Sequence, residues 1–210
     1  MNEQQSLEDL QHIKRMMERS SRFISLSGLS GIAAGLCALA GAWFASQKIN
    51  CWVKGDCDLS RLLGGSTGGS LINQLFWIAT LTFIAAFVLA FFFTYLRSKK
   101  NGTPLWGATT MRLFWNTFIP IAVGGAFLIR MMQLGEYQLV PPGCLLFYGL
   151  ALVNASKYTL SEVRYLGYGQ ILLGLCNLWL IGYGLQFWTM GFGVLHIVYG
   201  TLMWWKYERK

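Results

Sequence analysis

Six apolar stretches follow one another along the chain, each long enough to cross a membrane as a helix. A transmembrane helix needs about 20 predominantly apolar residues. The stretches cover residues 23–46, 72–96, 111–133, 138–157, 163–185 and 188–205. Pro and Gly interrupt them, and they lack the period-2 alternation of barrel strands. The pattern predicts an all-α membrane protein with one six-helix transmembrane domain over residues 23–205.

The polar segments at the two ends of the chain complete this organisation. Residues 1–22 carry apolar side chains at helical spacing, with acidic residues near the start and basic residues near the end. We expect an amphipathic helix on the inner membrane face, with its basic residues among anionic lipid headgroups. A plain extension of the first transmembrane helix fits the same pattern. Residues 206–210 form a short basic cytoplasmic tail.

Composition and charge agree with a membrane protein. The chain is 54% hydrophobic and 12% charged, whereas about 25% of the residues of a soluble protein are charged. The net charge of +8 would suggest nucleic acid as a partner of a soluble protein. With a cytoplasmic N-terminus, however, the outer segments hold only four basic residues, Lys48, Lys54, Arg61 and Arg130. This bias satisfies the positive-inside rule, so we expect both termini in the cytoplasm and no nucleic-acid partner.

Small residues line one face of the first apolar stretch. Ser27, Gly31, Ala34, Ala38 and Gly41 share that face, and Gly31 with Gly35 makes a GxxxG motif. Small residues let helix backbones approach closely inside a membrane. We therefore expect a central first helix, whereas the phenylalanine-rich second helix should face lipid.

A few polar side chains lie inside the apolar stretches, and they are the candidate functional residues. They are His196, Asn177, Gln170, Asn154 and Asn116. A hairpin of the last two helices turning near residues 186 and 187 places Asn177 and His196 at equal depth. Gly174 and Gly200 then allow the backbones to approach. We predict a hydrogen bond between Asn177 and a neutral His196, because an unpaired imidazole in hydrocarbon costs several kcal/mol.

Other side-chain pairs are expected at the outer side. Arg130 and Glu136 flank an outer turn and predict an interfacial ion pair. Cys51 and Cys57 fall in the same outer loop, where a disulfide would persist; their spacing permits a bridge without requiring one. The spans hold one His and no Asp or Glu away from their ends, so no metal site and no cofactor are predicted.

Two resemblances bear on activity. The string GLSG at residues 28–31, with His196 in the sixth helix, resembles the Ser-His dyad of rhomboid intramembrane proteases. The rhomboid serine belongs to the fourth helix, however, and its oxyanion-stabilising residues have no counterpart here. The runs MMERSSRFISLSGLSG and GFGVLHIVYGTLMWWKYERK resemble a family of multi-pass bacterial membrane proteins found mostly in Bacteroidetes. This resemblance implies an inner-membrane location and no particular activity.

Two function classes remain. The first is a non-enzymatic accessory, assembly or sensing subunit of the bacterial inner membrane. Such a subunit would pack through glycine-rich helix faces against a second copy or another membrane protein. The second is a small-solute transporter or channel, which requires the five polar residues to converge on one water-accessible cavity.

Overall fold

The fold is described from a computed structural model, which covers residues 27–209 except 55–70 and 102–106. The amphipathic helix predicted for residues 1–22 and the partner cysteine Cys57 lie outside these described residues. Every regular element in the described part is helical. The longer helices are α2 (Gly28–Lys54), α4 (Leu71–Asn101), α5 (Ala108–Gln133), α6 (Val140–Ala155), α7 (Glu162–Trp179) and α9 (His196–Tyr207).

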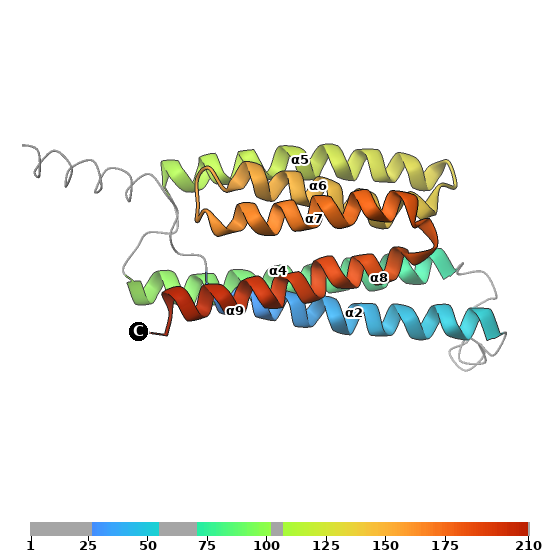
Figure 1. The fold of residues 1–210 in the computed structure, drawn as a ribbon, viewed down its shortest axis with the longest axis horizontal. Coiled ribbons are helices and arrows are strands. Elements are labelled where there is room, and N and C mark those ends of the chain that lie inside the picture. Colours follow the sequence, from blue (N-terminus) through green and yellow to red (C-terminus); the bar gives the residue numbers. More distant parts are fainter. Residues whose placement is uncertain (1–26, 55–70, 102–106, 210) are drawn as a thin grey trace, which may run out of the picture.

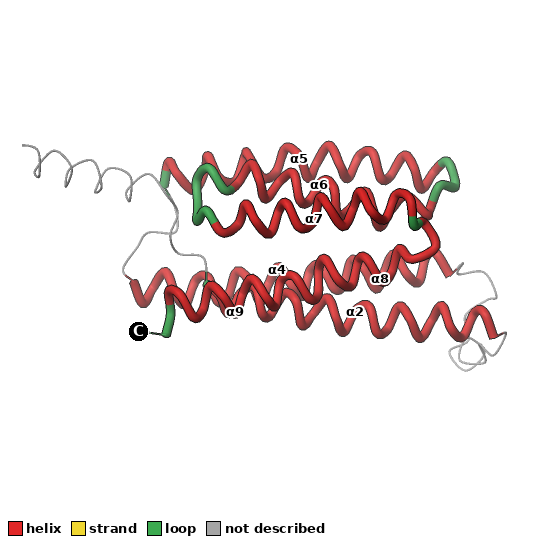
Figure 2. Tube along the Cα trace, viewed as in Figure 1, coloured by secondary structure: helices red, strands yellow, loops and turns green. Residues whose placement is uncertain are grey.

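Short helical elements lie at the turns that follow α5 and α7. A 3-10 turn, η1 (Tyr137–Leu139), leads into α6, and a second one, η2 (Ile181–Tyr183), follows α7. The chain then continues through α8 (Gly184–Trp188) and a π-helix, η3 (Thr189–Leu195), directly into α9. Figure 2 shows how little of the described chain lies in loops.

The helices form two layers, as Figure 1 shows. In one layer α6 lies between α5 and α7, and in the other α2 lies between α4 and α9. The last helix therefore packs beside the first, and the layers do not correspond to the two halves of the chain.

Four of the described helical segments are long and apolar enough to cross a membrane. They are Gly28–Val53, Leu71–Lys100, Ala108–Gln133 and Tyr137–Ala155. They agree with the first four predicted spans, although the first begins and ends later than predicted. The fifth predicted span ends early, at Trp179, and the sixth is interrupted by the π-helix.

Glycines bring α2 into backbone contact with the last helix. A Cβ atom added at Gly28 would lie 2.3 Å from the Trp204 amide nitrogen. One added at Gly35 would lie 2.8 Å from the Gly193 carbonyl oxygen. Side chains at these positions would push the helices apart. Of the predicted small-residue face, Gly31 meets α9, since a Cβ atom there would lie 3.1 Å from the Gly200 Cα atom, whereas Gly41 meets Thr82 of α4.

The glycines of the last two helices pack against different neighbours from those predicted. A Cβ atom at Gly174 would meet Leu146 of α6 at 2.8 Å, whereas one at Gly200 would meet the Ile32 amide nitrogen of α2 at 2.5 Å. The predicted close approach of Gly174 and Gly200 was therefore wrong. Gly174 and Gly200 each face a helix of their own layer.

The outer face of α4 is apolar and exposed, as expected of a helix that faces lipid. Phe83, Phe87, Phe91 and Phe92 are each at least half exposed. None of the most apolar window of this helix is buried inside the protein.

Candidate functional site

One group of buried polar residues centres on His196, the first residue of α9. Its Nε2 atom lies 2.9 Å from the Tyr148 hydroxyl of α6, and its Nδ1 atom lies 3.0 Å from the Gly191 carbonyl oxygen. Gln170 of α7 is fully buried and donates from Nε2 to the same carbonyl at 2.8 Å. We call Tyr148, Gln170, Gly191 and His196 the His196 network; it joins α6, α7 and η3.

The hydrogen bonds of this network assign the proton on the imidazole. The Gly191 carbonyl has no proton, so Nδ1 of His196 must donate to it. In the neutral imidazole that the sequence predicts, Nε2 then accepts the proton of the Tyr148 hydroxyl. The Gln170 amide nitrogen, 3.5 Å from Nδ1, is a second donor to the carbonyl. The neutral state itself stays a prediction.

The carbonyl that both side chains contact lies inside the π-helix. A π segment inserts an extra residue into the turn and breaks the regular ladder of backbone hydrogen bonds. Here the segment Thr189–Leu195 ends directly before His196. Gly191 is required in this segment, because a Cβ atom there would lie 2.5 Å from the Gln170 Oε1 atom.

The predicted hydrogen bond between Asn177 and His196 was wrong. The Asn177 Nδ2 atom donates to the Leu180 carbonyl at 3.1 Å, at the end of its own helix. The cause is the position of the turn: η2 places its centre about five residues earlier than predicted. Residues of α7 closer to its start, such as Gln170, therefore lie level with His196.

Asn116 and Asn154 form a separate polar pair between α5 and α6. The Asn154 Nδ2 atom donates to the Asn116 carbonyl at 2.8 Å and to its Oδ1 atom at 3.3 Å. Pro120 lies four residues after Asn116 inside α5 and has no N–H to donate to that carbonyl. The Asn154 amide supplies the missing donor, so the Asn116 carbonyl of α5 is hydrogen-bonded despite the proline.

The predicted pairs at the outer side have different outcomes. The ion pair of Arg130 with Glu136 was wrong, since Arg130 Nη1 instead contacts the Gln133 Oε1 atom at 3.3 Å. Gln133 lies one helical turn from Arg130 on α5, whereas Glu136 follows Gly135, where the chain reverses with a positive φ of 84°. The pairing of Cys51 with Cys57 stays a prediction, because Cys57 lies outside the described residues.

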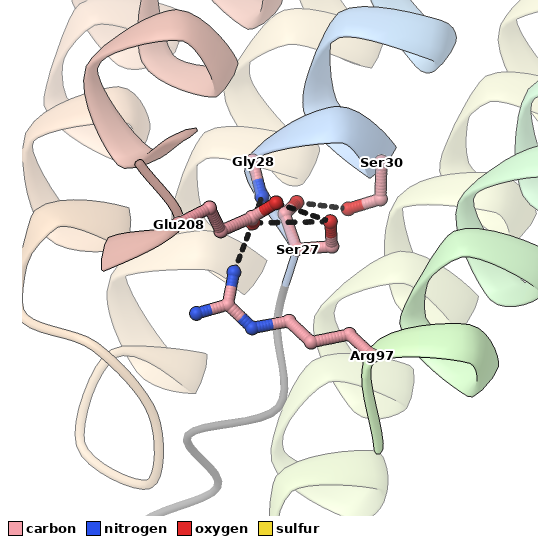
Figure 3. Close-up of polar contacts among 5 residues, drawn as sticks. All are labelled: Ser27, Gly28, Ser30, Arg97 and Glu208. Atoms are coloured by element: carbon pink, nitrogen blue, oxygen red, sulfur yellow. Dashed lines mark hydrogen bonds and ion pairs between the residues drawn. The ribbon is translucent and has the colours of Figure 1, made fainter. Parts of the chain in front are cut away.

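A cluster of polar groups at the other end of the bundle was not expected from the sequence. Figure 3 shows the Glu208 carboxylate between the start of α2 and the Arg97 side chain of α4. It accepts a hydrogen bond from the Gly28 amide at 2.5 Å, another from the Ser27 hydroxyl at 3.1 Å and an ion pair from Arg97. We call these residues, with Ser30, the terminal cluster.

The terminal cluster caps α2 with an acidic side chain from the end of α9. A carboxylate is favourable beside the free amides of a helix N-terminus. The side chains of Arg97 and Glu208 are only 12% and 16% exposed. The sequence held one signal for this cluster, because Glu208 is the only acidic residue of the tail, residues 206–210. Its basic neighbours made the tail read as a uniformly basic segment.

Ser30 and His196 belong to different networks. The Ser30 hydroxyl donates to the Ser27 carbonyl at 2.5 Å, within the terminal cluster, whereas the imidazole contacts Tyr148 and Gly191. A Ser-His dyad would need a hydrogen bond between the two side chains. Their observed partners give no support to the resemblance to rhomboid proteases.

Two cavities open on the sides of the bundle. A cleft of about 290 Å³ lies between the layers near the turns that follow α5 and α7, with an almost wholly apolar lining that includes Ile49, Leu75, Phe76 and Pro141. A groove of about 740 Å³ runs between α7 and α9 toward the opposite end, where Glu162 and Lys206 form part of its lining. We call the second cavity the α7–α9 groove.

An ion pair stands at the charged end of the α7–α9 groove. Lys206 Nζ donates to the Glu162 Oε1 atom at 2.5 Å, and the Tyr207 hydroxyl donates to the same oxygen at 2.9 Å. Burial by itself raises the pKa of Glu162, but the hydrogen bonds from Lys206, its own backbone and Tyr207 outweigh it and lower the pKa. The hydrogen bond to Glu162 raises the pKa of Lys206.

The described residues do not assemble a metal centre. Within residues 27–54, 71–101 and 107–209, no group of three His, Cys, Asp or Glu side chains could hold a metal ion. Comparisons with protein-family models, with curated proteins and with solved structures found no match to this chain. A function therefore has to be inferred from the residues of the chain itself.

Proposed function

We propose that the protein is a non-enzymatic subunit of the bacterial inner membrane, with six spans and both termini in the cytoplasm. The ends of α4 and α9 and the starts of α5 and α7 lie at one end of the bundle (Figure 1). Most described basic residues lie there, including Arg97, Lys99, Lys100, Arg164 and Lys206. Positive charge concentrates on the cytoplasmic side of membrane proteins. In this proposal α7 and the segment α8–α9 are the fifth and sixth spans.

One observation carries the choice of an accessory, assembly or sensing role over transport. The polar side chains inside the bundle pair locally, in separate places, instead of meeting at one cavity. Asn154 is bonded to Asn116, Asn177 to the end of α7, and Gln170 to the π-helix. A transporter places its polar groups around one substrate site near the middle of the membrane.

The contact with a partner has to use a different surface from the glycine faces. The glycines of α2, α6, α7 and α9 hold the protein's own helices together. The phenylalanine-rich outer face of α4 is apolar and exposed. We infer that a partner in the membrane, a second copy or another protein, packs on this face.

Cysteine accessibility tests both the orientation and the dry interior. In a variant lacking the native cysteines, Gln170→Cys is treated with a membrane-impermeant thiol reagent, with Lys157→Cys and Gln138→Cys as controls for the two membrane faces. We expect labelling of Gln138→Cys on intact cells, of Lys157→Cys only after permeabilisation, and of Gln170→Cys in neither case. Labelling of Gln170→Cys would favour a transporter, and labelling of Lys157→Cys on intact cells would reverse the orientation.

Site-specific photo-crosslinking in cells tests the partner surface. A photoreactive residue replaces Phe87 on α4 in one variant and Leu172 on α7 in the control. These two side chains are 63% and 62% exposed, so both are equally available to neighbours in the membrane. We expect a discrete protein adduct from Phe87 and none from Leu172. The accessory role fails if neither position forms a protein adduct, or if both form the same ones.

A further inference from the structure

The α7–α9 groove combines an apolar trough with a charged mouth. Leu166 of α7 faces Leu195, Val198 and Leu202 of the last helix along its walls. Met203 and Tyr199 pack beneath it against Leu160 and Val163. At its end the lining changes to Trp205, Lys206 and Glu162. A ligand that fits this lining is apolar over most of its length and polar at one end.

The mouth of the groove carries one positive charge in excess. Lys206 is 59% exposed at its side chain and uses one of its three N–H donors on Glu162. Arg209 places its guanidinium over the ring of Trp205 at 4.9 Å. Two cations against one carboxylate leave a net charge of +1, which a single phosphate diester would neutralise.

The length of the trough matches one leaflet of a membrane. From Leu195 to Lys206 the helix rises by roughly 16 Å at about 1.5 Å per residue. Half of the hydrocarbon core of a bilayer is about 15 Å thick. An acyl chain lying in the groove would reach from the headgroup level to the middle of the membrane.

We propose that the α7–α9 groove binds an anionic phospholipid, with its acyl chain in the trough and its phosphate on Lys206 and Arg209. The proposed orientation makes this a lipid of the cytoplasmic leaflet. The binding itself rests on the groove alone, and it holds whichever way the protein faces. An interfacial basic residue contributes about 1 kcal/mol to the binding of anionic lipid, or about fivefold in affinity.

The charge of the mouth is tested by lipid retention. The full chain is purified in detergent, mixed with equal amounts of phosphatidylglycerol and phosphatidylcholine of identical acyl chains, and examined by native mass spectrometry. We expect selective retention of phosphatidylglycerol. The selectivity should fall about fivefold in Arg209→Gln and further in Arg209→Gln with Lys206→Gln. Lys99→Gln with Lys100→Gln, at the end of α4, removes the same charge elsewhere and should leave the selectivity unchanged.

A second variant separates the charge from the ion pair. Glu162→Gln breaks the contact with Lys206 as Lys206→Gln does, but it keeps both cations. We expect it to retain phosphatidylglycerol at least as well as the native chain. Loss of retention in Glu162→Gln would mean that the ion pair shapes the groove, and it would overturn the assignment of the phosphate to Lys206.

The trough is tested by filling it. Val198→Trp places a large side chain in the groove, and Val123→Trp places the same residue on the exposed side of α5; the native valines are 49% and 58% exposed. We expect loss of the bound lipid in Val198→Trp alone. Equal retention of the two lipids by the native chain, or unchanged retention in Val198→Trp, would refute the proposal. Neither result depends on the membrane orientation or on a partner at α4.

Discussion

Replacing Gly200 by alanine tests whether the contact between α2 and α9 holds the bundle together. The added Cβ atom would lie 2.5 Å from the Ile32 amide nitrogen and 2.6 Å from the Gly28 carbonyl oxygen. Both are backbone atoms, so no side-chain rotation relieves the overlap. Ordinary contact distances begin at 3.4 Å, and the two helices would have to separate by roughly 1 Å to restore them.

The expected loss of stability follows from two opposing effects. Inserting a methyl group into a packed interface costs about 1–3 kcal/mol. The value should be near the upper end here, because separation also weakens the close contacts of Gly31 and Gly35 with the last helix. Alanine favours a helix over glycine by about 1 kcal/mol. The net loss is about 2 kcal/mol, which corresponds to a fall in Tm of roughly 4–8 °C.

Gly125 provides the matched control. It lies inside α5, and a Cβ atom added there would meet nothing within 4 Å. Gly125→Ala gains the same helix propensity without an overlap, so its Tm in detergent should equal or exceed that of the native protein. The measurement is thermal unfolding of the three proteins followed by circular dichroism. Equal Tm values for Gly200→Ala and Gly125→Ala would refute the reasoning.

Three further predictions concern polar groups. Glu208→Gln should destabilise the protein by about 2–3 kcal/mol and lower its Tm, because the mostly buried Arg97 loses its counter-charge. The control Glu136→Gln, in the exposed turn after α5, should leave the Tm unchanged. Tyr148→Phe removes the donor to His196 Nε2 and should cost about 1–3 kcal/mol in chemical unfolding, and a loss below about 0.3 kcal/mol would contradict the assigned tautomer. The pKa of Glu162 is lowered in the folded protein, so its contribution is present at neutral pH and is lost as the pH falls through the folded pKa. Between about pH 7 and about pH 3, the native protein should therefore lose more Tm than Glu162→Gln, and parallel pH profiles would contradict this.

The helices could be predicted from the sequence because the length of each apolar run directly indicates a segment that can span a membrane. The first four spans coincide with long apolar segments that are recognisable in the structure by the same property. The last hairpin was harder, because its apolar run continues through the turn. Leu180 and Ile181 are as apolar as the helices they join, so composition could not reveal that α7 ends at Trp179.

The candidate site was predicted as a set of residues but not as a set of contacts. Burial of Gln170, Asn177 and His196 followed from their places in apolar helices. Their partners depend on the helix register, and the early turn and the π segment both change that register. Tyr148 gave no signal at all, because an aromatic residue in an apolar span is ordinarily a packing residue.

The two irregular places in the backbone account for the polar residues better than a shared site does. Pro120 leaves the Asn116 carbonyl without its helical donor, and the Asn154 amide supplies one at 2.8 Å. The Gly191 carbonyl lies inside the π-helix, and the Gln170 amide donates to it at 2.8 Å. Backbone groups inside a membrane must be satisfied within the protein. Asn154 and Gln170 thus each donate to a carbonyl of a neighbouring helix where the backbone of that helix is irregular, and neither amide is needed to hold a solute.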